Sequence, residues 1–487
     1  MRGSPRVSQE KQAHKAPGDR GLVLELTREE LRRRIERGDL RIAVYGLGRI
    51  GLPLAVAWLR AGQRVMGVDI DRETVEKINM GASPIQDEPG IPEAVSEYTS
   101  KGRFQATTDL VRASEESDVK LVAVPTTLKE GGGFNSEPLE RALRGIGRGL
   151  KRGDGVSIEC TVPPTTTSGL ARRILEEESG LEAEREFALA YSPERVYEGR
   201  ILRDLEENYP KIVGGLGPKS TELFSTLYRR IARKGVIEMS TPTAAELSKL
   251  FEGVYRDVNI ALANELAELC QALDIDFMEV REASNSQPYC HLHKPGVGVG
   301  GPCIPVYPYF IIEKANDRGL PMPLTRIARE INEEMPKRTV NLIVRALEKF
   351  GGKVQGVRVA ILGLAFRGDI ADARNSPTYS IASQLKSLGA DVVVHDPYLK
   401  EDGHLRELGI PLTTSLEEAV GKASIVVIAT DHKEYADKEF TKIIKLSETP
   451  IILFDGRGII DPTKIQGNLY FTGIGRRRLH LAVQGMK

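Results

Sequence analysis

The chain has 487 residues, too many for one ordinary hydrophobic core, so its length predicts two or three domains. Its 68 Lys and Arg residues balance 68 Asp and Glu residues, which excludes a polyelectrolyte that binds nucleic acid or an anionic membrane through its net charge. No apolar run approaches the roughly 20 residues needed to cross a bilayer, and the N-terminal residues include no apolar signal-peptide core, so we expect a cytoplasmic protein.

The four cysteines are too sparse for a disulfide framework in a chain of this length. A reducing compartment leaves such thiols free, so at least one of them is available to react. They are Cys160, Cys270, Cys290 and Cys303.

The first 39 residues divide into two parts. Residues 1–21 are polar and charged without periodicity, which predicts a disordered extension. Thr27 and Glu30 have the spacing of a capping box, so we expect a short basic helix over residues 28–37 that ends at Gly38.

The stretch from residue 40 to 236 alternates β-branched runs with helical segments. This alternation is typical of a parallel, doubly wound sheet. The clearest strands are RIAVYG (41–46), RVMGVD (64–69), VKLVAVP (119–125) and GVSIE (155–159).

A helical texture replaces this alternation over residues 237–345. Within residues 243–273, apolar side chains recur at three- and four-residue steps without a proline or a tight turn, which predicts one long amphipathic helix. A stripe that stays apolar for about eight turns also predicts a homodimer or a higher homo-oligomer packed through this helix. The apolar positions are Leu247, Leu250, Phe251, Val254, Val258, Leu262, Leu266, Leu269 and Leu273.

Strands resume over residues 346–487 with a spacing like that of the first set. The expected fold class is therefore α/β, with two Rossmann-like doubly wound domains joined by a long central helix and a helical domain. The later strands are VRVAILG (357–363), ADVVVHDP (390–397), ASIVVIATD (423–431) and PIILFDG (450–456).

Three glycines directly after the first strand have the spacing G-x-G-x-x-G. They open a helix expected over residues 50–59, where backbone amides and the helix dipole can hold a pyrophosphate. The next strand ends in Asp69, whose carboxylate can accept hydrogen bonds from the adenosine ribose and repel a 2′-phosphate, so NAD is favoured over NADP. The alternative is that the glycines only make a tight turn and the carboxylate caps a loop. The cofactor-binding residues expected here are Gly46, Gly48, Arg49, Ile50, Gly51 and Asp69.

The second α/β domain lacks this signature. It has Gly363 but no glycine triplet, and its third clear strand is followed by Asp431 and His432 rather than by a phosphate loop. This domain need not bind a dinucleotide.

One cysteine lies in a loop of unusual composition. Four glycines precede Cys303, and Pro302 and Pro305 flank it, so the backbone can approach a ligand closely while the prolines fix the direction of the thiol. We therefore interpret Cys303 as a nucleophile, whereas Cys270 occupies a core-like position in the long helix and is expected to be inert. The glycines are Gly296, Gly298, Gly300 and Gly301.

A zinc site is the alternative interpretation of this region. Cys290, His291, His293 and Cys303 are all potential ligands. Their separation and the adjacent glycine-rich loop do not match the usual paired-ligand spacings, so we expect no metal.

Seven motifs between residue 40 and the C-terminus together resemble the UDP-glucose/GDP-mannose dehydrogenase family. They are GLGRIGLP (46–53), VPTT (124–127), ECTVPPTTT (159–167), YSPERVYEG (191–199), ELSKL (246–250), GVGVGGPCIP (296–305) and LGLAFRGDIADARNSP (362–377). The stretch RDVNIALANEL (256–266), with PCIPVYPYF (302–310), looks most like the branch that acts on UDP-N-acetylhexosamines, with UDP-N-acetyl-D-mannosamine as the best match.

This resemblance implies a four-electron oxidation of a sugar C6 alcohol to a carboxylate with two NAD and no release of aldehyde. The Cys303 thiolate would capture the aldehyde as a thiohemiacetal, which is oxidised to a thioester and then hydrolysed. Lys249 would stabilise the oxyanions, and Glu198 would be the base for the hydrolytic water. Thr126 would position that water, with Glu194 as a neighbouring carboxylate. The alternative is that Lys249 is a solvated surface lysine and that the other three are ordinary loop residues.

The resemblance also completes the two ligand sites. Phe366, Arg367 and Arg457 lie in segments that contact UDP in the family, where an Arg can hold a diphosphate bidentately and a Phe can pack on the nucleotide. Their alternative is a domain-core Phe and surface arginines. The further cofactor-binding residues are Pro125, Thr126 and Glu159, and the further substrate-binding residues are Arg256, Asn259 and Gly300.

Three positions depart from the family pattern near the chemistry. Gly253 stands where relatives have Asn, Tyr307 replaces Asp, and Pro302 replaces a common His. We hypothesise that the Tyr307 ring occupies the space above Gly253 and that its hydroxyl serves the oxyanion or water, which makes Tyr307 a candidate catalytic residue. The alternative is that Tyr307 points into the core and Gly253 only eases helix packing.

Other functions remain open at this point. The substrate could be UDP-glucose or UDP-GlcNAc, or the chain could be a non-catalytic nucleotide-sugar sensor. A two-electron hydroxyacid dehydrogenase also joins a dinucleotide domain to a helical domain, but it has no use for a glycine-framed cysteine or a second α/β domain.

Overall fold

The computed structural model describes residues 22–129, 133–436, 451–464 and 469–481, so the expected disorder of residues 1–21 falls outside the described residues. The chain forms two compact units. Unit 1 comprises residues 1–125, 136–160 and 165–245, and unit 2 comprises residues 126–135, 161–164 and 246–487. The division into three domains with a boundary near residue 237 stays a prediction.

The N-terminal part of unit 1 begins with the 3-10 turn η1 (Val23–Glu25) and helix α1 (Arg28–Arg37). The expected capping box of Thr27 and Glu30 is present, and Gly38 ends α1 in the left-handed conformation at φ 71°, so both predicted helix ends are confirmed. Leu31 and Ile35 are buried on the inner face of α1. The helix packs beside α9 (Pro218–Tyr228).

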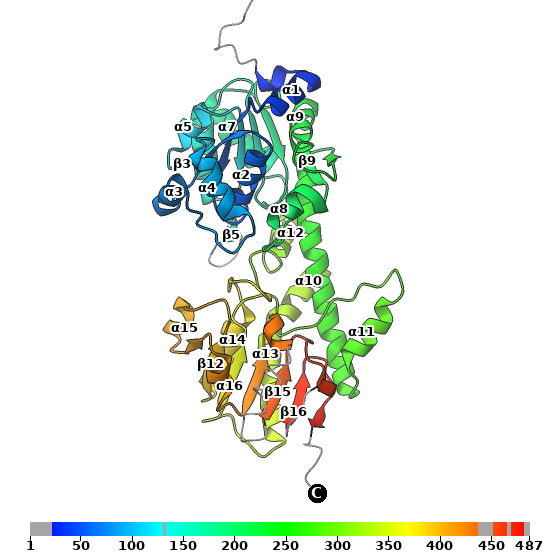
Figure 1. Ribbon diagram of the computed structural model, residues 1–487. Helices are drawn as coiled ribbons and strands as arrows, with labels where there is room; N and C mark the ends of the chain where they lie inside the picture. Colours follow the sequence, from blue (N-terminus) through cyan, green and yellow to red (C-terminus); the bar gives the residue numbers. More distant parts are fainter. Residues whose placement is uncertain (1–21, 130–132, 437–450, 465–468, 482–487) are drawn as a thin grey trace, which may run out of the picture. The chain divides into compact units, whose positions relative to one another are not determined.

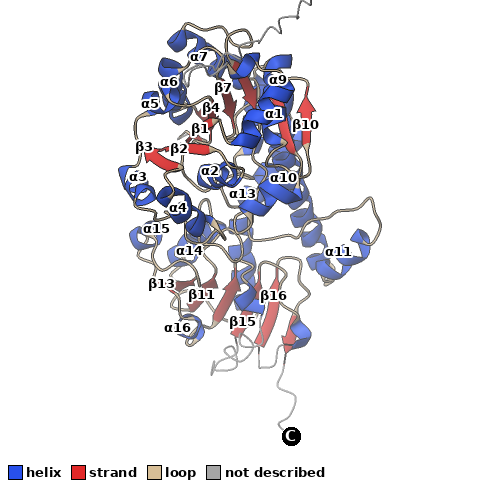
Figure 2. Ribbon diagram, turned by 45° about the horizontal axis from the view of Figure 1, so that its top comes forward, coloured by secondary structure: helices blue, strands red, loops and turns tan. Residues whose placement is uncertain are grey.

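The sheet of unit 1 has eight strands in the order β10-β9-β8-β7-β4-β1-β2-β3, and all neighbours are parallel except β8 and β9 (Figures 1 and 2). The four predicted strands of this domain are confirmed as β1, β2, β4 and β7. The strands are β1 (Arg41–Tyr45), β2 (Arg64–Val68), β3 (Phe104–Thr107), β4 (Val119–Val122), β7 (Gly155–Ile158), β8 (Ala188–Tyr191), β9 (Lys211–Gly215) and β10 (Val236–Met239).

Helices cover both faces of this sheet because its strands are apolar on both sides. In β1, Ile42 and Val44 belong to one core cluster, whereas Tyr45 points to the other face and donates a hydrogen bond to the Leu110 carbonyl. The helices are α2 (Gly51–Arg60), α3 (Arg72–Asn79), α4 (Ile91–Ser100), α5 (Leu110–Glu115), α6 (Glu137–Gly149), α7 (Arg172–Ser179) and α8 (Ile201–Arg203), besides α1 and α9.

Unit 2 contains most of the predicted long helix, which the structure has as α10 (Pro242–Ala272), followed by α11 (Phe277–Asn285), α12 (Tyr307–Asn316) and α13 (Pro323–Glu348). A two-stranded hairpin, β5 (Thr127–Leu128) and β6 (Phe134–Asn135), also belongs to unit 2. Leu128 and Phe134 of this hairpin pack on the apolar cluster formed by α10 and α12. The hairpin is therefore part of the helical core, although it follows a strand of unit 1 in sequence.

The sheet of unit 2 has the order β13-β12-β11-β14-β15-β16-β17, with only β17 antiparallel among its described neighbours (Figure 1). Its faces alternate in β11, where Val359 and Ile361 pack with α13 and α14, while Ala360 and Leu362 pack with α16. The strands are β11 (Arg358–Leu362), β12 (Asp391–His395), β13 (Leu412–Thr413), β14 (Ile425–Ile428), β15 (Ile451–Asp455), β16 (Leu469–Gly473) and β17 (Leu479–Leu481). The helices on this sheet are α14 (Pro377–Ser387), α15 (Gly403–Glu407) and α16 (Leu416–Val420).

Both sheets place their first strand beside the second on one side and the fourth on the other, which is the strand order of a Rossmann-like domain. The predicted fold class is confirmed. Among the described residues, no helix is both long and apolar enough to cross a membrane.

Candidate active site

The glycine-rich loop after β1 has the geometry of a dinucleotide cradle. A Cβ at Gly46 would lie 2.6 Å from the Ala123 carbonyl oxygen, and a Cβ at Gly51 would lie 1.8 Å from the Gly46 carbonyl oxygen, so neither position accepts a side chain. Gly48 is exposed, and no atom would lie within 4 Å of a Cβ built on it, so its backbone is accessible. Helix α2 begins here without a side-chain cap, so its first N–H groups are suited to a pyrophosphate.

Asp69 holds this loop from the end of β2. Its Oδ2 accepts a hydrogen bond from the Leu47 N–H at 2.8 Å, and its Oδ1 accepts one from the Asp71 N–H at 3.0 Å. The carboxylate is only partly buried, so it can also accept from a ribose hydroxyl. These residues fit NAD, and Pro125 follows at the carboxyl end of β4, the strand next to β1.

Three buried ionisable groups lie beyond β7 and β8 in unit 1. Lys211 of β9 contacts both Glu159 and Glu194, at 2.8 Å for the Glu159 Oε2 and more closely for Glu194. Burial alone would lower the pKa of Lys211, but these two carboxylates raise it above its usual value. The Tyr228 hydroxyl also donates to Glu159. The expected site residues Glu159 and Glu194 are thus engaged in a buried ion cluster.

Sequence reasoning missed Lys211. The sequence does place this lysine at the start of the apolar run KIVGG. An apolar run of this kind indicates a buried strand, and a lysine buried with it needs an anionic partner.

Glu198 lies on the loop between β8 and α8, near the glycine-rich loop. Its Oε1 is 3.8 Å from the Arg49 Nε, and the Arg49 Nη1 donates to Asp87 at 2.9 Å. The Glu198 side chain lies beside the Arg49 guanidinium and is 16% exposed, so it is partly accessible. The predicted base and the predicted cofactor loop are therefore brought together within unit 1.

Unit 2 groups the candidate catalytic residues of α10 and α12. Cys303 packs against the apolar cluster that contains Leu250 and Tyr307, and its carbonyl accepts the Tyr307 N–H at 3.0 Å. The Lys249 Nζ lies 5.8 Å from the centre of the Tyr307 ring, within cation–π range. Thr126 immediately precedes the hairpin that packs on the same cluster.

The hypothesis that the Tyr307 ring fills the space above Gly253 is confirmed. A Cβ built on Gly253 would lie 2.7 Å from the Tyr307 Cδ2 and 3.1 Å from its Cβ. The Tyr307 hydroxyl accepts a hydrogen bond from the Thr161 Oγ1 at 3.0 Å. Thr161 was part of the motif ECTVPPTTT but had no expected role, because nothing in the sequence links it to a residue 146 positions away.

The other cysteines differ from Cys303 in their surroundings. Burial raises the pKa of the Cys160 thiol to about 12, and it also raises the pKa of Cys270. Both shifts favour the thiol over the nucleophilic thiolate. Among the described residues, no three His, Cys, Asp or Glu side chains gather as a metal site.

The glycines before Cys303 are required by packing within unit 2. A Cβ on Gly300 or Gly301 would lie 2.8 Å from Phe366, and a Cβ on Gly296 would lie 2.9 Å from the Arg457 Nη1. The loop thus contacts the segment expected to bind the nucleotide. Phe366 thus explains why Gly300 and Gly301 carry no side chain, and the expectation that this loop lets the backbone approach a ligand stays a prediction.

Two asparagines of α10 hold the entrance to this loop. The Asn264 Oδ1 accepts the Gly296 N–H at 2.9 Å, and the Asn259 Oδ1 accepts the His293 N–H at 2.8 Å. Asn259 also donates to the His291 carbonyl at 2.9 Å. Burial, aided by the charges of Arg256 and Arg281, lowers the pKa of His293.

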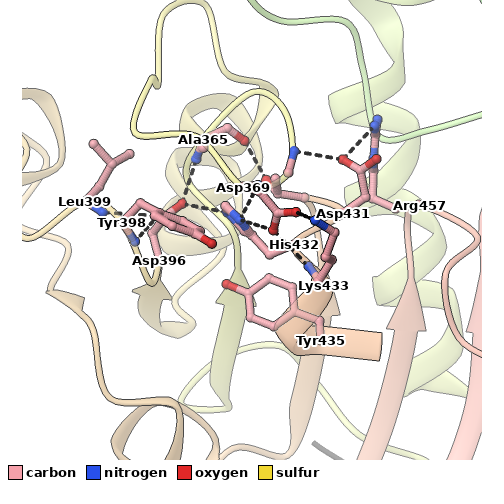
Figure 3. A network of polar contacts seen from close by, with 12 residues as sticks. Ala365, Asp369, Asp396, Tyr398, Leu399, Asp431, His432, Lys433, Tyr435 and Arg457 are labelled. Carbon is pink, nitrogen blue, oxygen red and sulfur yellow. Dashed lines mark hydrogen bonds and ion pairs between the residues drawn. The ribbon is translucent and has the colours of Figure 1, made fainter. Parts of the chain in front are cut away.

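The loop after β11, which carries Phe366 and Arg367, is fixed by a buried polar network (Figure 3). The Asp396 Oδ2 accepts the N–H groups of Leu364 and Ala365 at 2.9 and 2.8 Å, and it lies 3.2 Å from the His432 Nε2. The His432 Nδ1 accepts the Asp369 N–H at 2.9 Å. Because Nδ1 accepts, Nε2 carries the hydrogen and donates a hydrogen bond to the Asp396 carboxylate.

Arg457 approaches the same loop from the end of β15. Its Nη2 contacts the Asp431 Oδ1 at 3.2 Å, and that oxygen also accepts the Gly368 N–H at 3.1 Å (Figure 3). Burial by itself would raise the pKa of Asp431, but the Arg457 charge and the hydrogen bonds to the carboxylate together lower it below its usual value. Arg457 is thus oriented toward the Phe366 loop by an ion pair.

Family models for three parts of the UDP-glucose/GDP-mannose dehydrogenase family match the chain: the NAD binding domain over residues 40–232, the central domain over 243–334, and the UDP binding domain over 360–462. A UDP-N-acetyl-D-mannosamine dehydrogenase of Pyrococcus horikoshii is 39% identical over 90% of this chain and 99% of its own length.

Two solved structures are also similar. A UDP-D-ManNAc dehydrogenase from Pyrococcus horikoshii has a TM-score of 0.82 at 38% identity, covering 90% of this chain and 99% of its own. An NDP-N-acetyl-D-galactosaminuronic acid dehydrogenase from Methanosarcina mazei has a TM-score of 0.78 at 33% identity, covering 92% of this chain and 98% of its own.

Removing the carboxylate after β2 tests the ribose contact. Asp69→Ala is expected to weaken NAD binding and to relax the rejection of NADP, because the hydrogen-bond acceptor and its charge disappear together. Binding titrations with both cofactors measure this change, with Asp39→Ala as a control at an exposed carboxylate. An unchanged preference for NAD would show that Asp69 does not contact the ribose.

The Tyr307 hydroxyl is tested by its removal. Tyr307→Phe should lower kcat for nucleotide-sugar oxidation by about 10- to 1,000-fold, the usual effect of losing one well-placed donor, with little change in thermal stability. Tyr309→Phe on the same helix is the matched control, since its hydroxyl bonds only Glu333 among the described contacts. A wild-type kcat for Tyr307→Phe would assign the tyrosine to packing.

The contact with Gly253 gives the second arm of this experiment. Gly253→Asn alone should impair activity because its Cβ collides with the ring. Combining it with Tyr307→Asp should recover part of the loss, and a double variant no better than the worse single variant would contradict the pairing.

Proposed function

Because the chain belongs to the UDP-glucose/GDP-mannose dehydrogenase family and is an NAD-dependent nucleotide-sugar dehydrogenase, we propose that it oxidises the C6 alcohol of a UDP-N-acetylhexosamine to the uronate through a thioester on Cys303. UDP-N-acetyl-D-mannosamine is the substrate we favour. The observation that carries the mechanism is that Cys303 packs on the apolar cluster of Tyr307, with the Lys249 Nζ 5.8 Å from the centre of the same ring.

The chemistry proceeds in four steps, which are a first oxidation, thiohemiacetal formation, a second oxidation and hydrolysis. NAD supplies the hydride acceptor for two successive oxidations, and the C6 hydroxyl proton leaves to water in the first of them. After the first oxidation, the Cys303 sulfur attacks the C6 aldehyde carbon, and the carbonyl oxygen becomes the alkoxide of a thiohemiacetal. Loss of the second hydride from C6 gives the thioester. Water then attacks its carbonyl, the C–S bond breaks, and the Cys303 thiolate is regenerated with the carboxylate product.

The charged groups have distinct roles in this scheme. The Lys249 ammonium stabilises the alkoxide and the tetrahedral oxyanion, with the Tyr307 hydroxyl as a second donor. Glu198 takes the proton of the attacking water, which Thr126 positions. We assign the base to Glu198 rather than Glu194 because the Glu194 carboxylate is engaged with Lys211.

The C-terminal domain binds the UDP part of the substrate in this proposal. Arg457 and Arg367 hold the diphosphate, and Phe366 packs at the nucleotide, supported by the buried network that fixes their loop. Arg256 and Asn259 serve the sugar end. The preference for a hexosamine is supported by the relatives, several of which are named UDP-N-acetyl-D-mannosamine dehydrogenases.

UDP-glucose, UDP-GlcNAc and a non-catalytic sensor are the alternatives. A screen of UDP-ManNAc, UDP-GlcNAc, UDP-glucose and GDP-mannose with counting of NADH separates them, because a sensor binds a nucleotide sugar without forming NADH.

The covalent mechanism makes a quantitative prediction. We expect two NADH per molecule of substrate and a uronate product, and Cys303→Ser should abolish turnover while leaving NAD binding intact. Cys290→Ser is the matched control and should keep full activity. One NADH with a released aldehyde, or wild-type turnover by Cys303→Ser, would contradict catalysis by this thiol.

We also propose that the enzyme is a homodimer or a higher homo-oligomer through α10. Phe251, Tyr255, Leu262 and Leu269 of this helix are 45–57% exposed, which is unusual for large apolar side chains that repeat along one element. Light scattering of the active enzyme should give a mass of at least two chains. A strictly monomeric active species would contradict the proposal.

A further inference from the structure

A buried carboxylate outside the proposed chemistry lies in the loop between α3 and α4. Glu88 is 1% exposed, yet it has no lysine or arginine among its described partners. Its two oxygens instead accept backbone N–H groups of another loop, with Oε2 2.6 Å from the Gly199 nitrogen and Oε1 2.6 Å from the Ile201 nitrogen. These two short hydrogen bonds, one to each carboxylate oxygen, fix the backbone of the second loop.

The loop that Glu88 holds is the one that carries Glu198. A second buried carboxylate binds the same loop on the N-terminal side of Glu198, where the Asp204 Oδ2 accepts the Tyr197 N–H at 2.9 Å. Asp204 is 2% exposed. The backbone on both sides of Glu198, at Tyr197 and Gly199, is therefore clamped by buried acceptors.

The residue before Glu88 acts on the Glu198 side chain through Arg49. Asp87 accepts from the Arg49 Nη1 at 2.9 Å, and the Nε of the same guanidinium lies 3.8 Å from the Glu198 Oε1. Arg49 belongs to the glycine-rich loop after β1. Two adjacent residues, Asp87 and Glu88, thus connect the cofactor loop to both the backbone and the side chain of the base.

We propose that Glu88 is a positioning residue for thioester hydrolysis, which places Glu198 by anchoring the Gly199 and Ile201 amides, with Asp87 and Arg49 setting the direction of its carboxylate. This inference rests on the proposed role of Glu198 as the base. In this proposal, thioester hydrolysis depends on Glu88, whereas the binding of cofactor and substrate does not.

The test is Glu88→Gln in the full-length enzyme. A glutamine has the same size, but an NH2 group replaces one of the two acceptor oxygens. One backbone N–H therefore meets a donor instead of an acceptor, and one of the two hydrogen bonds is lost. We expect hydrolysis to slow by about 10- to 100-fold, as for a base displaced by a fraction of an ångström to one ångström, with unchanged KM for NAD.

Two readouts separate positioning from a general structural effect. In a single turnover with the nucleotide sugar, the variant should release NADH in a burst and then accumulate a covalent adduct on Cys303, seen by intact-protein mass spectrometry. Hydrogen exchange at the Gly199 and Ile201 amides should accelerate. Glu97→Gln, an exposed glutamate on α4, is the matched control and should show neither effect.

Glu198→Gln distinguishes the two levels of the proposal. If Glu198→Gln accumulates the adduct while Glu88→Gln hydrolyses it at the wild-type rate, the positioning role is overturned and the proposed function stands. If Glu198→Gln itself hydrolyses normally, the base assignment fails, and this inference fails with it.

A second variant covers the case in which Glu88→Gln does not fold. Glu88→Asp keeps the charge but has a shorter reach, so it cannot hold both amides in the present geometry. It should slow hydrolysis at least about threefold without changing KM for NAD, and a wild-type hydrolysis rate in Glu88→Asp would overturn the proposal.

Discussion

Each sheet depends on a carboxylate at the end of its second strand that accepts backbone N–H groups from the loop after its first strand. Asp69 does this for Leu47 in unit 1, and Asp396 does it for Leu364 and Ala365 in unit 2. These bonds fix loops that have no regular structure of their own. The two carboxylates differ in exposure, because Asp69 is partly accessible while Asp396 is fully buried and also bound to His432. The same scaffold therefore leaves the carboxylate partly accessible in unit 1 and encloses it completely in unit 2.

Close packing determines the rest of the candidate site in unit 2. A glycine within a helix costs about 1 kcal/mol relative to alanine, and at Gly253 this cost is offset by the Tyr307 ring that occupies the side-chain position. The glycines before Cys303 similarly let the loop lie on Phe366. Cys303 thus lies in a segment that packs against α10 through Tyr307 and against the loop after β11 through Phe366.

Local patterns predicted much of this protein. The capping box of α1, the extent of α10 and eight strands follow from periodicity and turn residues, because these features depend on neighbours in sequence. The pairing of Gly253 with Tyr307 was also predictable, since two departures from one family pattern suggested a shared cause. The engagement of Glu159 and Glu194 with Lys211, and the bond from Thr161 to Tyr307, were not, because they join residues whose proximity only the tertiary fold creates. For the same reason the sequence did not reveal that the glycine loop packs on Phe366.

The N-terminal helix has a consequence for the order in which the chain acquires its structure during synthesis. The Leu24 N–H donates to the Gly153 carbonyl, and α1 packs beside α9. Both partners of this N-terminal segment therefore lie more than about 100 residues later in the chain. At roughly 5–20 residues per second, a ribosome needs on the order of 10–40 s after making α1 to complete residue 228. During that interval Leu31 and Ile35 have no partner surface from α9. The basic, capped helix can form early, but its apolar face is buried only when the last part of unit 1 has emerged.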